Sequence, residues 1–248
     1  MKAAAKWLAL LALAFFGLQL FFVGRVALMA VVAPQSTSFQ RSEAWRIANE
    51  KGRLRWRHEW VAYSRISDNL KRAVIASEDD GFTNHDGVDW DALEKAWEKN
   101  AKAEQKAATQ KPAAKVAPGK PAPKPPKVVG GSTITQQLAK NLFLSGERTL
   151  LRKGQEFVLT LMLEQLLSKQ RILEIYLNSV EWGEGVFGAE AAAQHYFRKP
   201  AAQLSAYEAA RLAVMLPRPR YYEKLPNSGY LASRAEVIAG RMGGAQLP

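Results

Sequence analysis

The sequence predicts a mainly α-helical protein with little or no sheet and a transmembrane helix at its N-terminus. Apolar residues recur at helical spacing in several segments, whereas no segment strongly shows the period-two alternation of a strand. A long apolar run also stands close to the first residue. The 248 residues, of which 48% are hydrophobic, are enough for one soluble domain with its own core.

Composition limits the chemistry and the partners of this chain. It has no cysteine, so disulfides, thiolate catalysis and cysteine-ligated zinc are excluded. The formal net charge of +12 suits nucleic acid, anionic lipid or another phosphate-bearing partner, and solubility alone is the alternative explanation.

The N-terminal apolar run is predicted to be a membrane anchor. Residues 7–23 are apolar and at the low end of length for a bilayer span, and the apolar pattern resumes after Arg25. We expect residues 1–33 to form the anchor outside the globular fold, with Arg25 near the outer boundary. Lys2 and Lys6 favour a cytoplasmic N-terminus, which places the rest of the chain outside. A cleaved signal peptide is the alternative.

The segments that follow the anchor are predicted to be mostly helical. Residues 36–64 are expected to form a polar approach segment with several aromatic residues. Trp90, Leu93 and Trp97 stand at helical spacing, and the two tryptophans are expected in the core. Three glycines between residues 183 and 188 interrupt the helical pattern. The predicted helices cover residues 68–77, 89–100, the segment capped by Thr133, and residues 150–178, 189–197, 205–216 and 230–242.

Residues 101–127 have a different composition, with many lysines, alanines and prolines and almost no large apolar side chain. Such a segment cannot offset the entropy of ordering by burying apolar surface. We therefore expect a disordered basic loop that interrupts one domain. Two interpretations of the loop stay open: it is a neutral insertion, or its positive charge attracts anionic lipid or polymer.

The most informative cluster lies in residues 73–87. The apolar stretch 73–76 ends on acidic residues that include Glu78 and Asp79. A carboxylate at the end of an apolar helix can have a raised pKa, because desolvation disfavours its charged form. Glu78 is therefore a candidate general base near neutral pH. His85, in the same loop, has no partner at metal-ligand spacing, so a histidine metal site is not expected.

A second cluster occupies residues 130–140, where two glycines precede a helix start rich in hydroxyl groups. Thr133 is expected as the N-cap and Gln136 as the reciprocal member of a capping box. Helix N-termini suit phosphate, although an ordinary capped helix is the more common meaning of such a segment. Gln137 lies one helical turn from Lys140.

Two further clusters lie on the long helix predicted over residues 150–178 and just before it. Arg148, Arg152 and Glu156 fall on one helical stripe, with Lys153 beside them. They form either a solvated salt-bridge face or a cationic clamp for a diphosphate, with a carboxylate that orients the clamp or holds a metal. The last cluster, residues 169–178, ends in a helix terminus that is usually structural.

Together, these blocks resemble the ordered motifs of the peptidoglycan glycosyltransferase family. The resemblance covers roughly residues 60–219, interrupted by the basic loop. No transpeptidase domain follows it, so the chain looks like a monofunctional biosynthetic transglycosylase. The matching blocks are Glu78-Asp79-x-x-Phe82-x-x-His85-x-Gly87, Gly131-Ser132-Thr133-x-x-Gln136-Gln137, Arg152-Lys153-x-x-Glu156 and Lys169-x-x-Ile172-Leu173-Glu174-x-Tyr176-Leu177-Asn178.

The resemblance implies a lysozyme-like, two-lobed glycosyltransferase domain over residues 34–248. It also implies polymerisation of lipid II into β-1,4-linked glycan strands, with release of undecaprenyl diphosphate. Glu78 would act as the base, and Glu156 would be the second catalytic carboxylate. The residues implied in substrate binding are Asp79, Phe82, His85, Ser132, Thr133, Gln136, Gln137, Lys140, Arg148, Arg152, Lys153, Glu174 and Asn178.

The resemblance also sets expectations for cofactors, partners and location. A divalent cation, Mg²⁺ or Mn²⁺, is left open as a cofactor. The expected partners are lipid II, the nascent glycan strand, the membrane and proteins of cell-wall synthesis and division, without nucleic acid. The expected location is the bacterial inner membrane, with the catalytic domain on the periplasmic face. A lytic glycosidase of the cell wall and a non-catalytic membrane scaffold are the alternative functions.

Overall fold

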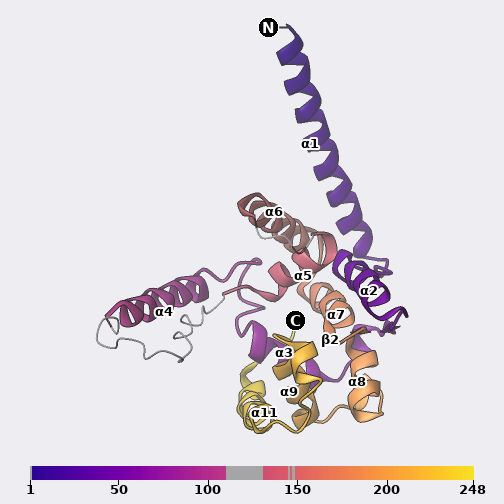
Figure 1. The fold of residues 1–248 in the computed structure, drawn as a ribbon, viewed down its shortest axis with the longest axis vertical. Coiled ribbons are helices and arrows are strands. Elements are labelled where there is room, and N and C mark those ends of the chain that lie inside the picture. The colour runs from indigo at the N-terminus through magenta and orange to yellow at the C-terminus, as the bar shows by residue number, and fades with distance from the viewer. Residues whose placement is uncertain (1, 110–130, 145, 147–148) are drawn as a thin grey trace, which may run out of the picture.

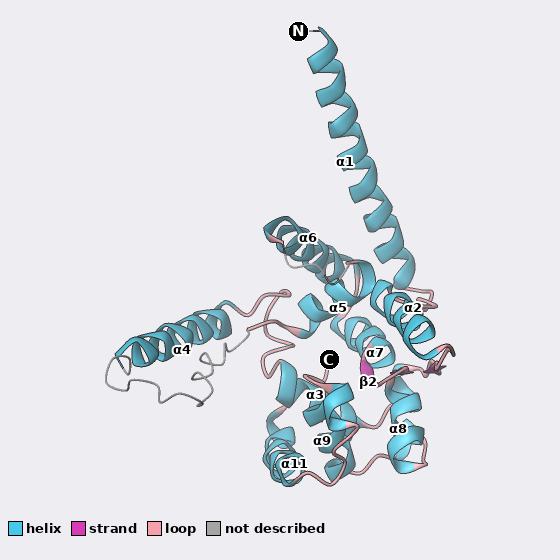
Figure 2. Ribbon diagram, viewed as in Figure 1, coloured by secondary structure: helices cyan, strands magenta, loops and turns pink. Residues whose placement is uncertain are grey.

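The computed structural model describes residues 2–109, 131–144, 146 and 149–248, and helices dominate this part of the chain (Figure 1 and Figure 2). The prediction of a mainly α protein with little sheet is confirmed. The longer helices are α1 (Lys2–Met29), α2 (Ser38–Lys51), α3 (Asp68–Glu78), α4 (Trp90–Thr109), α5 (Ile134–Phe143), α6 (Leu150–Leu166), α7 (Lys169–Ser179), α8 (Ala189–Phe197), α9 (Ala206–Met215) and α11 (Gly229–Arg241). The short elements are α10 (Pro219–Tyr222), three 3₁₀ helices (Tyr63–Arg65, Ala201–Gln203 and Met242–Gly244), and strands β1 (Arg57–His58), β2 (Glu181–Gly183) and β3 (Val186–Phe187).

The core of the domain lies where α3 packs against α9 and α11. Leu70, Val74 and Ile75 of α3 are almost completely buried, and each such side chain stabilises the fold by about 1.5–3 kcal/mol. Ser67 caps the helix, because its hydroxyl accepts from the backbone N–H of Asn69. The apolar face therefore fixes α3 in the core and leaves its last residue at the edge.

A second group of helices consists of α5, α6 and α7, with α5 packed against the other two and against α2. The prediction of one helix over residues 150–178 is wrong, because the chain turns after Leu166 and forms two helices, α6 and α7. Ser168 begins α7 as its N-cap and accepts from the backbone N–H of Arg171 at 3.2 Å. Apolar periodicity continues across this break, since both helices pack on the same core.

Helix α2 occupies part of the segment predicted to be a polar approach segment, residues 36–64. Thr37 and Gln40 form a complete capping box at its start, and Gly52 ends it in the left-handed conformation. Of the residues of α2, only Gln40 and Ile47 are buried, so the helix lacks the apolar stripe that would have predicted it.

The three strands form one small sheet in the order β1–β3–β2. β1 runs parallel to β3, and β2 runs antiparallel to it. Gly185, in the turn between β2 and β3, has φ +74°, and a Cβ there would lie 2.3 Å from the carbonyl oxygen of Arg55. The turn therefore needs glycine to bring the chain segment before β1 against the sheet.

Helix α4 projects from the body of the domain (Figure 1) and corrects two predictions. It extends to Thr109, so the expected basic loop cannot begin at residue 101. Alanine, lysine, glutamate and glutamine are good helix formers, which explains why the helix continues into that composition. The remainder of the loop, residues 110–127, lies outside the described residues. Trp90 and Trp97 are 64% and 76% exposed, so the prediction that they lie in the core is wrong.

Helix α1 is the one described helix long and apolar enough to cross a membrane, over Ala3–Met29. Its last turns nevertheless pack against the domain, since Val26 and Met29 are buried. The Arg25 guanidinium lies 5.8 Å from the centre of the Phe143 ring of α5. The expectation that residues 1–33 lie wholly outside the globular fold is therefore wrong for this end of the helix.

Candidate active site

Glu78 is the last residue of α3, next to the buried side chains of Val74 and Ile75. Its Oε2 atom accepts a hydrogen bond from Nε2 of Gln137 at 2.9 Å. Burial raises the pKa of the Glu78 carboxyl, and the negative charge of Asp79 raises it further. The bond from Gln137 and the charge of Lys140 lower it, without cancelling the rise. Such a carboxylate can accept a proton at a higher pH than an ordinary glutamate.

Asp79 connects two parts of the site, and both of its carboxylate oxygens have partners within the protein. Its Oδ1 atom is 2.9 Å from Nε2 of His85, and its Oδ2 atom accepts from the backbone N–H of Ile134 at 2.9 Å. The backbone N–H of Gly87 donates to Nδ1 of His85, so Nε2 carries the proton donated to Asp79. Asp89 lies close enough to complete a possible metal-ligand group, but it caps α4 by accepting from Ala92. We interpret this cluster as a brace that orients the loop after Glu78.

Phe82, Thr133 and Gln136 belong to the same framework. Phe82 is fully buried, with Nζ of Lys169 4.7 Å from the centre of its ring. Thr133 and Gln136 form the predicted capping box of α5, which confirms that expectation. The Thr133 hydroxyl also donates to the carbonyl of Gly87 at 2.6 Å. These side chains hold the start of α5 against the loop that follows Glu78.

A group of cations surrounds Glu156 of α6, which is only 4% exposed. Nη1 of Arg152 donates to Oε2 of Glu156 at 3.1 Å, and Nζ of Lys153 donates to Oε1. Lys140 of α5 stands nearby, and desolvation within the cleft lowers its pKa, although Glu156 opposes this shift. The structure thus brings Lys140, Arg152, Lys153 and Glu156 together, whereas Arg148 lies outside the described residues.

Two adjoining cavities form the candidate cleft. The larger, of about 720 Å³, is lined by Gln137, Lys140 and Arg152. The smaller, of about 300 Å³, is lined by Glu78 and by Ser132 at the start of α5. Gln137, in the wall of the larger cavity, is hydrogen-bonded to Glu78, in the wall of the smaller one, so the two cavities are neighbours. A carboxylate of raised pKa in one cavity therefore lies beside a concentration of positive charge in the other.

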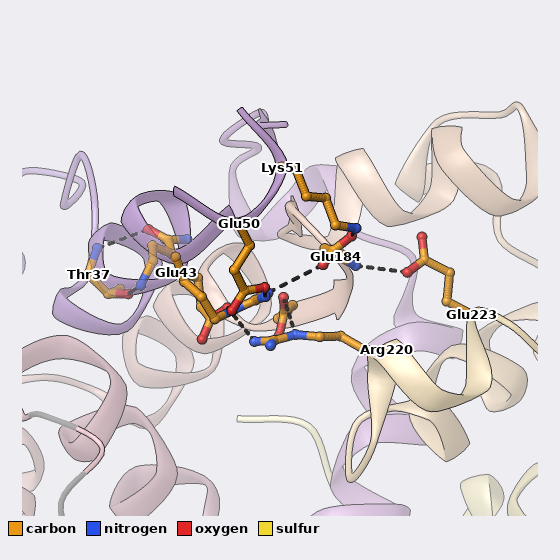
Figure 3. Close-up of polar contacts among 10 residues, drawn as sticks. Thr37, Glu43, Glu50, Lys51, Glu184, Arg220 and Glu223 are labelled. Carbon is orange, nitrogen blue, oxygen red and sulfur yellow. Dashed lines mark hydrogen bonds and ion pairs between the residues drawn. The ribbon is translucent and has the colours of Figure 1, made fainter. Parts of the chain in front are cut away.

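A network of charged side chains lies where α2, the β2–β3 turn and α10 meet (Figure 3), and two of its members, Glu43 and Glu181, line the larger cavity. Arg220 donates to both oxygens of Glu181, at distances of 3.0–3.1 Å, and pairs with Glu43 of α2. Glu184 accepts from Lys51 of α2. Burial raises the pKa of Glu181, and Arg220 lowers it. The sequence analysis missed this network because its members are far apart in the chain and form no local motif.

Glu174 and Asn178, predicted as substrate-binding residues, lie in the framework behind the cleft. Asn178 is fully buried, and its side chain bonds to both the N–H and the carbonyl of Val61 at 2.9 Å. Glu174 accepts from the backbone N–H of Tyr63 at 3.1 Å and from Arg171 at 2.7 Å. These bonds attach the segment before α3 to α7.

A half-buried carboxylate of raised pKa beside a cationic group is suited to transferring a group away from an anionic leaving group. The transglycosylase family model matches residues 46–110 and 121–243, so the chain belongs to the transglycosylase family.

Proteins named biosynthetic peptidoglycan transglycosylase are similar along almost the whole chain. The protein from Burkholderia thailandensis is 53% identical, over 100% of this chain and 90% of its own length. The protein from Paraburkholderia phytofirmans is 52% identical, over 97% of this chain and 91% of its own. The protein from Herminiimonas arsenicoxydans is 53% identical, over 93% and 91%.

Proposed function

We propose that this protein is a peptidoglycan glycosyltransferase that polymerises lipid II into β-1,4-linked glycan strands and releases undecaprenyl diphosphate. The observation that carries the proposal is the proximity of Glu78 to the cations around Glu156, in neighbouring cavities whose walls are linked by the Gln137–Glu78 hydrogen bond. The family of the chain and the names of its relatives support the same activity.

Glu78 is the proposed general base. The 4-hydroxyl of the acceptor sugar attacks the anomeric carbon of the donor, while Glu78 takes the hydroxyl proton. A new C–O bond forms as the bond to the diphosphate oxygen breaks, and that oxygen leaves with the electron pair. Attack from the opposite face converts the α linkage into a β linkage. The raised pKa of Glu78 suits proton transfer from a weakly acidic hydroxyl.

Lys140, Arg152 and Lys153 are the proposed partners of the leaving diphosphate, since charge-assisted bonds to phosphate are stronger than neutral ones. Glu156 holds Arg152 and Lys153 in place and offsets part of their charge in the absence of substrate. A divalent cation does not fit at Glu156, because both carboxylate oxygens already accept from cationic side chains. The proposed reaction therefore uses no metal ion at Glu156.

The proposed location is the inner membrane, with α1 as a single span and the domain on the periplasmic face. The apolar helix Ala3–Met29 supports a span, and Lys2 and Lys6 support a cytoplasmic N-terminus. An anchored enzyme meets a lipid-linked substrate within the same two-dimensional layer, which raises the effective concentration of encounter. Proteins of cell-wall synthesis and division are proposed partners on the basis of the activity alone.

Glu78→Gln tests the proposal, since it keeps the side-chain shape and removes the base. Polymerisation of labelled lipid II by the full-length protein should fall by about 10²- to 10⁴-fold. Glu94→Gln, at an exposed position on α4, is the matched control and should keep the parental rate. A parental rate for Glu78→Gln would refute the assignment of the base.

Two parallel incubations of the parent separate the alternative functions. Cleavage of preformed glycan without polymerisation of lipid II would indicate a lytic glycosidase, and inactivity on both would indicate a scaffold. The cationic cluster disfavours the lytic alternative, because a neutral glycosidic bond has no diphosphate leaving group.

A further inference from the structure

Tyr176 of α7 carries a hydroxyl that the proposed mechanism does not use. The residue is 1% exposed, and its ring is part of the core. Its hydroxyl lies 3.0 Å from Oε1 of Gln137, whose Nε2 atom lies 2.9 Å from Oε2 of Glu78. Three helices, α7, α5 and α3, thus contribute one group each to a continuous chain of hydrogen bonds that ends on the proposed base.

Hydrogen-bond chemistry fixes the direction of this chain. An ionised carboxylate can only accept, so Gln137 must turn its NH₂ group towards Glu78. The amide oxygen then faces Tyr176, and the tyrosine hydroxyl must donate to it. Burial raises the pKa of the Tyr176 hydroxyl well above its ordinary value, so the hydroxyl keeps its proton near neutral pH.

We propose that Tyr176 is a positioning residue that acts through Gln137 and keeps Glu78 in its proton-accepting form. This inference rests on the proposed function. The hydroxyl holds the amide in the one orientation that donates to a carboxylate. It also polarises the amide, which strengthens the second bond of the chain, because linked hydrogen bonds reinforce one another.

Other charges also act on Glu78, and they stay in place when the tyrosine hydroxyl is removed. They come from α3 and the residues after it, from α5, and from the walls of the smaller cavity. Asp79 and Lys140 act directly on the charge of Glu78, and the other charged groups that line the smaller cavity are Asp80, Asp89, Lys95, Lys99 and Arg241. A change in the titration of Glu78 on removal of the hydroxyl therefore reports on the hydrogen-bond chain.

Tyr176→Phe removes the hydroxyl and keeps the buried ring. The loss should move the acidic limb of the pH profile of kcat/KM for lipid II upward by roughly half a pH unit. Activity should fall about threefold on the acidic side and approach the parental value on the alkaline side. Titration of the ¹³C-labelled Glu78 carboxyl by NMR in the same full-length protein should show the same upward shift.

Tyr63→Phe is the matched control, because the Tyr63 hydroxyl is buried and has no hydrogen-bond partner among the described residues. It should leave the pH profile unchanged. Substitution of Tyr176 by 3-fluorotyrosine keeps the shape and makes the hydroxyl a stronger donor, so the limb should move to lower pH. This variant tests the inference even if Tyr176→Phe folds poorly.

A loss of activity that is equal at all pH values, with an unchanged Glu78 titration, would overturn the inference, as would no change at all. An upward shift that Tyr63→Phe reproduces would also overturn it. If the parent fails to polymerise lipid II, the proposed function fails instead. The NMR titration then still decides whether Tyr176 acts on Glu78.

Discussion

Replacing Asn178 by alanine tests whether this predicted substrate-binding residue is instead a structural connector. The Asn178 side chain accepts from the backbone N–H of Val61 and donates to its carbonyl, both at 2.9 Å. Val61 is 4% exposed and lies just before α3, the helix that carries Glu78. The substitution leaves both backbone groups of Val61 without a partner in a place that water does not reach.

The size of the effect follows from these two bonds. An unpaired buried donor or acceptor costs about 1–3 kcal/mol, so the pair should cost roughly 2–6 kcal/mol. A loss of about 4 kcal/mol lowers the Tm of a domain of this size by about 8–16 °C. Those values are large for a single substitution and far above the effect of most surface changes.

Thermal unfolding of the full-length protein in detergent, followed by circular dichroism, measures this loss. Asn227→Ala, at an exposed position, is the control and should change Tm by no more than 1–2 °C. Lipid II turnover at a temperature well below the lowered Tm should keep a nearly parental KM. A parental Tm combined with a raised KM would refute the structural interpretation and favour a direct contact with substrate.

Three further predictions concern neighbouring positions. Gly188→Ala should also lower Tm, because Gly188 has φ +86° and a Cβ there would lie 2.8 Å from the carbonyl oxygen of Asn178; an unchanged Tm would contradict this geometry. The pKa of Glu78 in the folded parent is raised above its ordinary value of 4.5, so the parent loses folding stability as the pH rises above 4.5. Glu78→Gln should therefore be more stable than the parent at pH 7 and equally stable below about pH 4.5. Equal differences in Tm at the two pH values would contradict this prediction. Glu156→Gln should lower kcat and leave Tm no higher than the parent, because its two bound cations lose their counter-charge; an unaltered rate would show that their placement does not depend on Glu156.

The sequence was sufficient to predict the structural features whose cause is local. It placed Glu78 at the end of an apolar helix, and it placed Thr133 and Gln136 in a capping box by their spacing. In both cases the physical cause lies within one or two turns of helix. The cationic group around Glu156 follows the same rule, since Arg152 and Lys153 contact it at helical spacings of three and four residues.

Contacts between distant segments could not be predicted in this way. The bond between Tyr176 and Gln137 and the pairing of Arg220 with Glu181 depend on how helices pack. The wrong expectation for Trp90 and Trp97 has a similar cause, because helical spacing of aromatic residues shows that they share a face but not what covers it. The spacing of apolar residues shows which face of a helix is apolar, but only the packing of the whole fold determines what that face contacts.

Helix α5 links α1, the proposed membrane anchor, to the candidate active site. Gln137 near its start bonds to Glu78, Lys140 in its middle faces the larger cavity, and Phe143 at its end contacts Phe22 and Arg25 of α1. Six residues of α-helix cover about 9 Å, so the contacts with the proposed base, the proposed diphosphate partner Lys140 and the contacts with α1 follow one another along one short helix. The proposed substrate, lipid II, has the same order of parts, with a sugar, a diphosphate and a lipid. One helix therefore connects the proposed reaction site to the proposed membrane anchor.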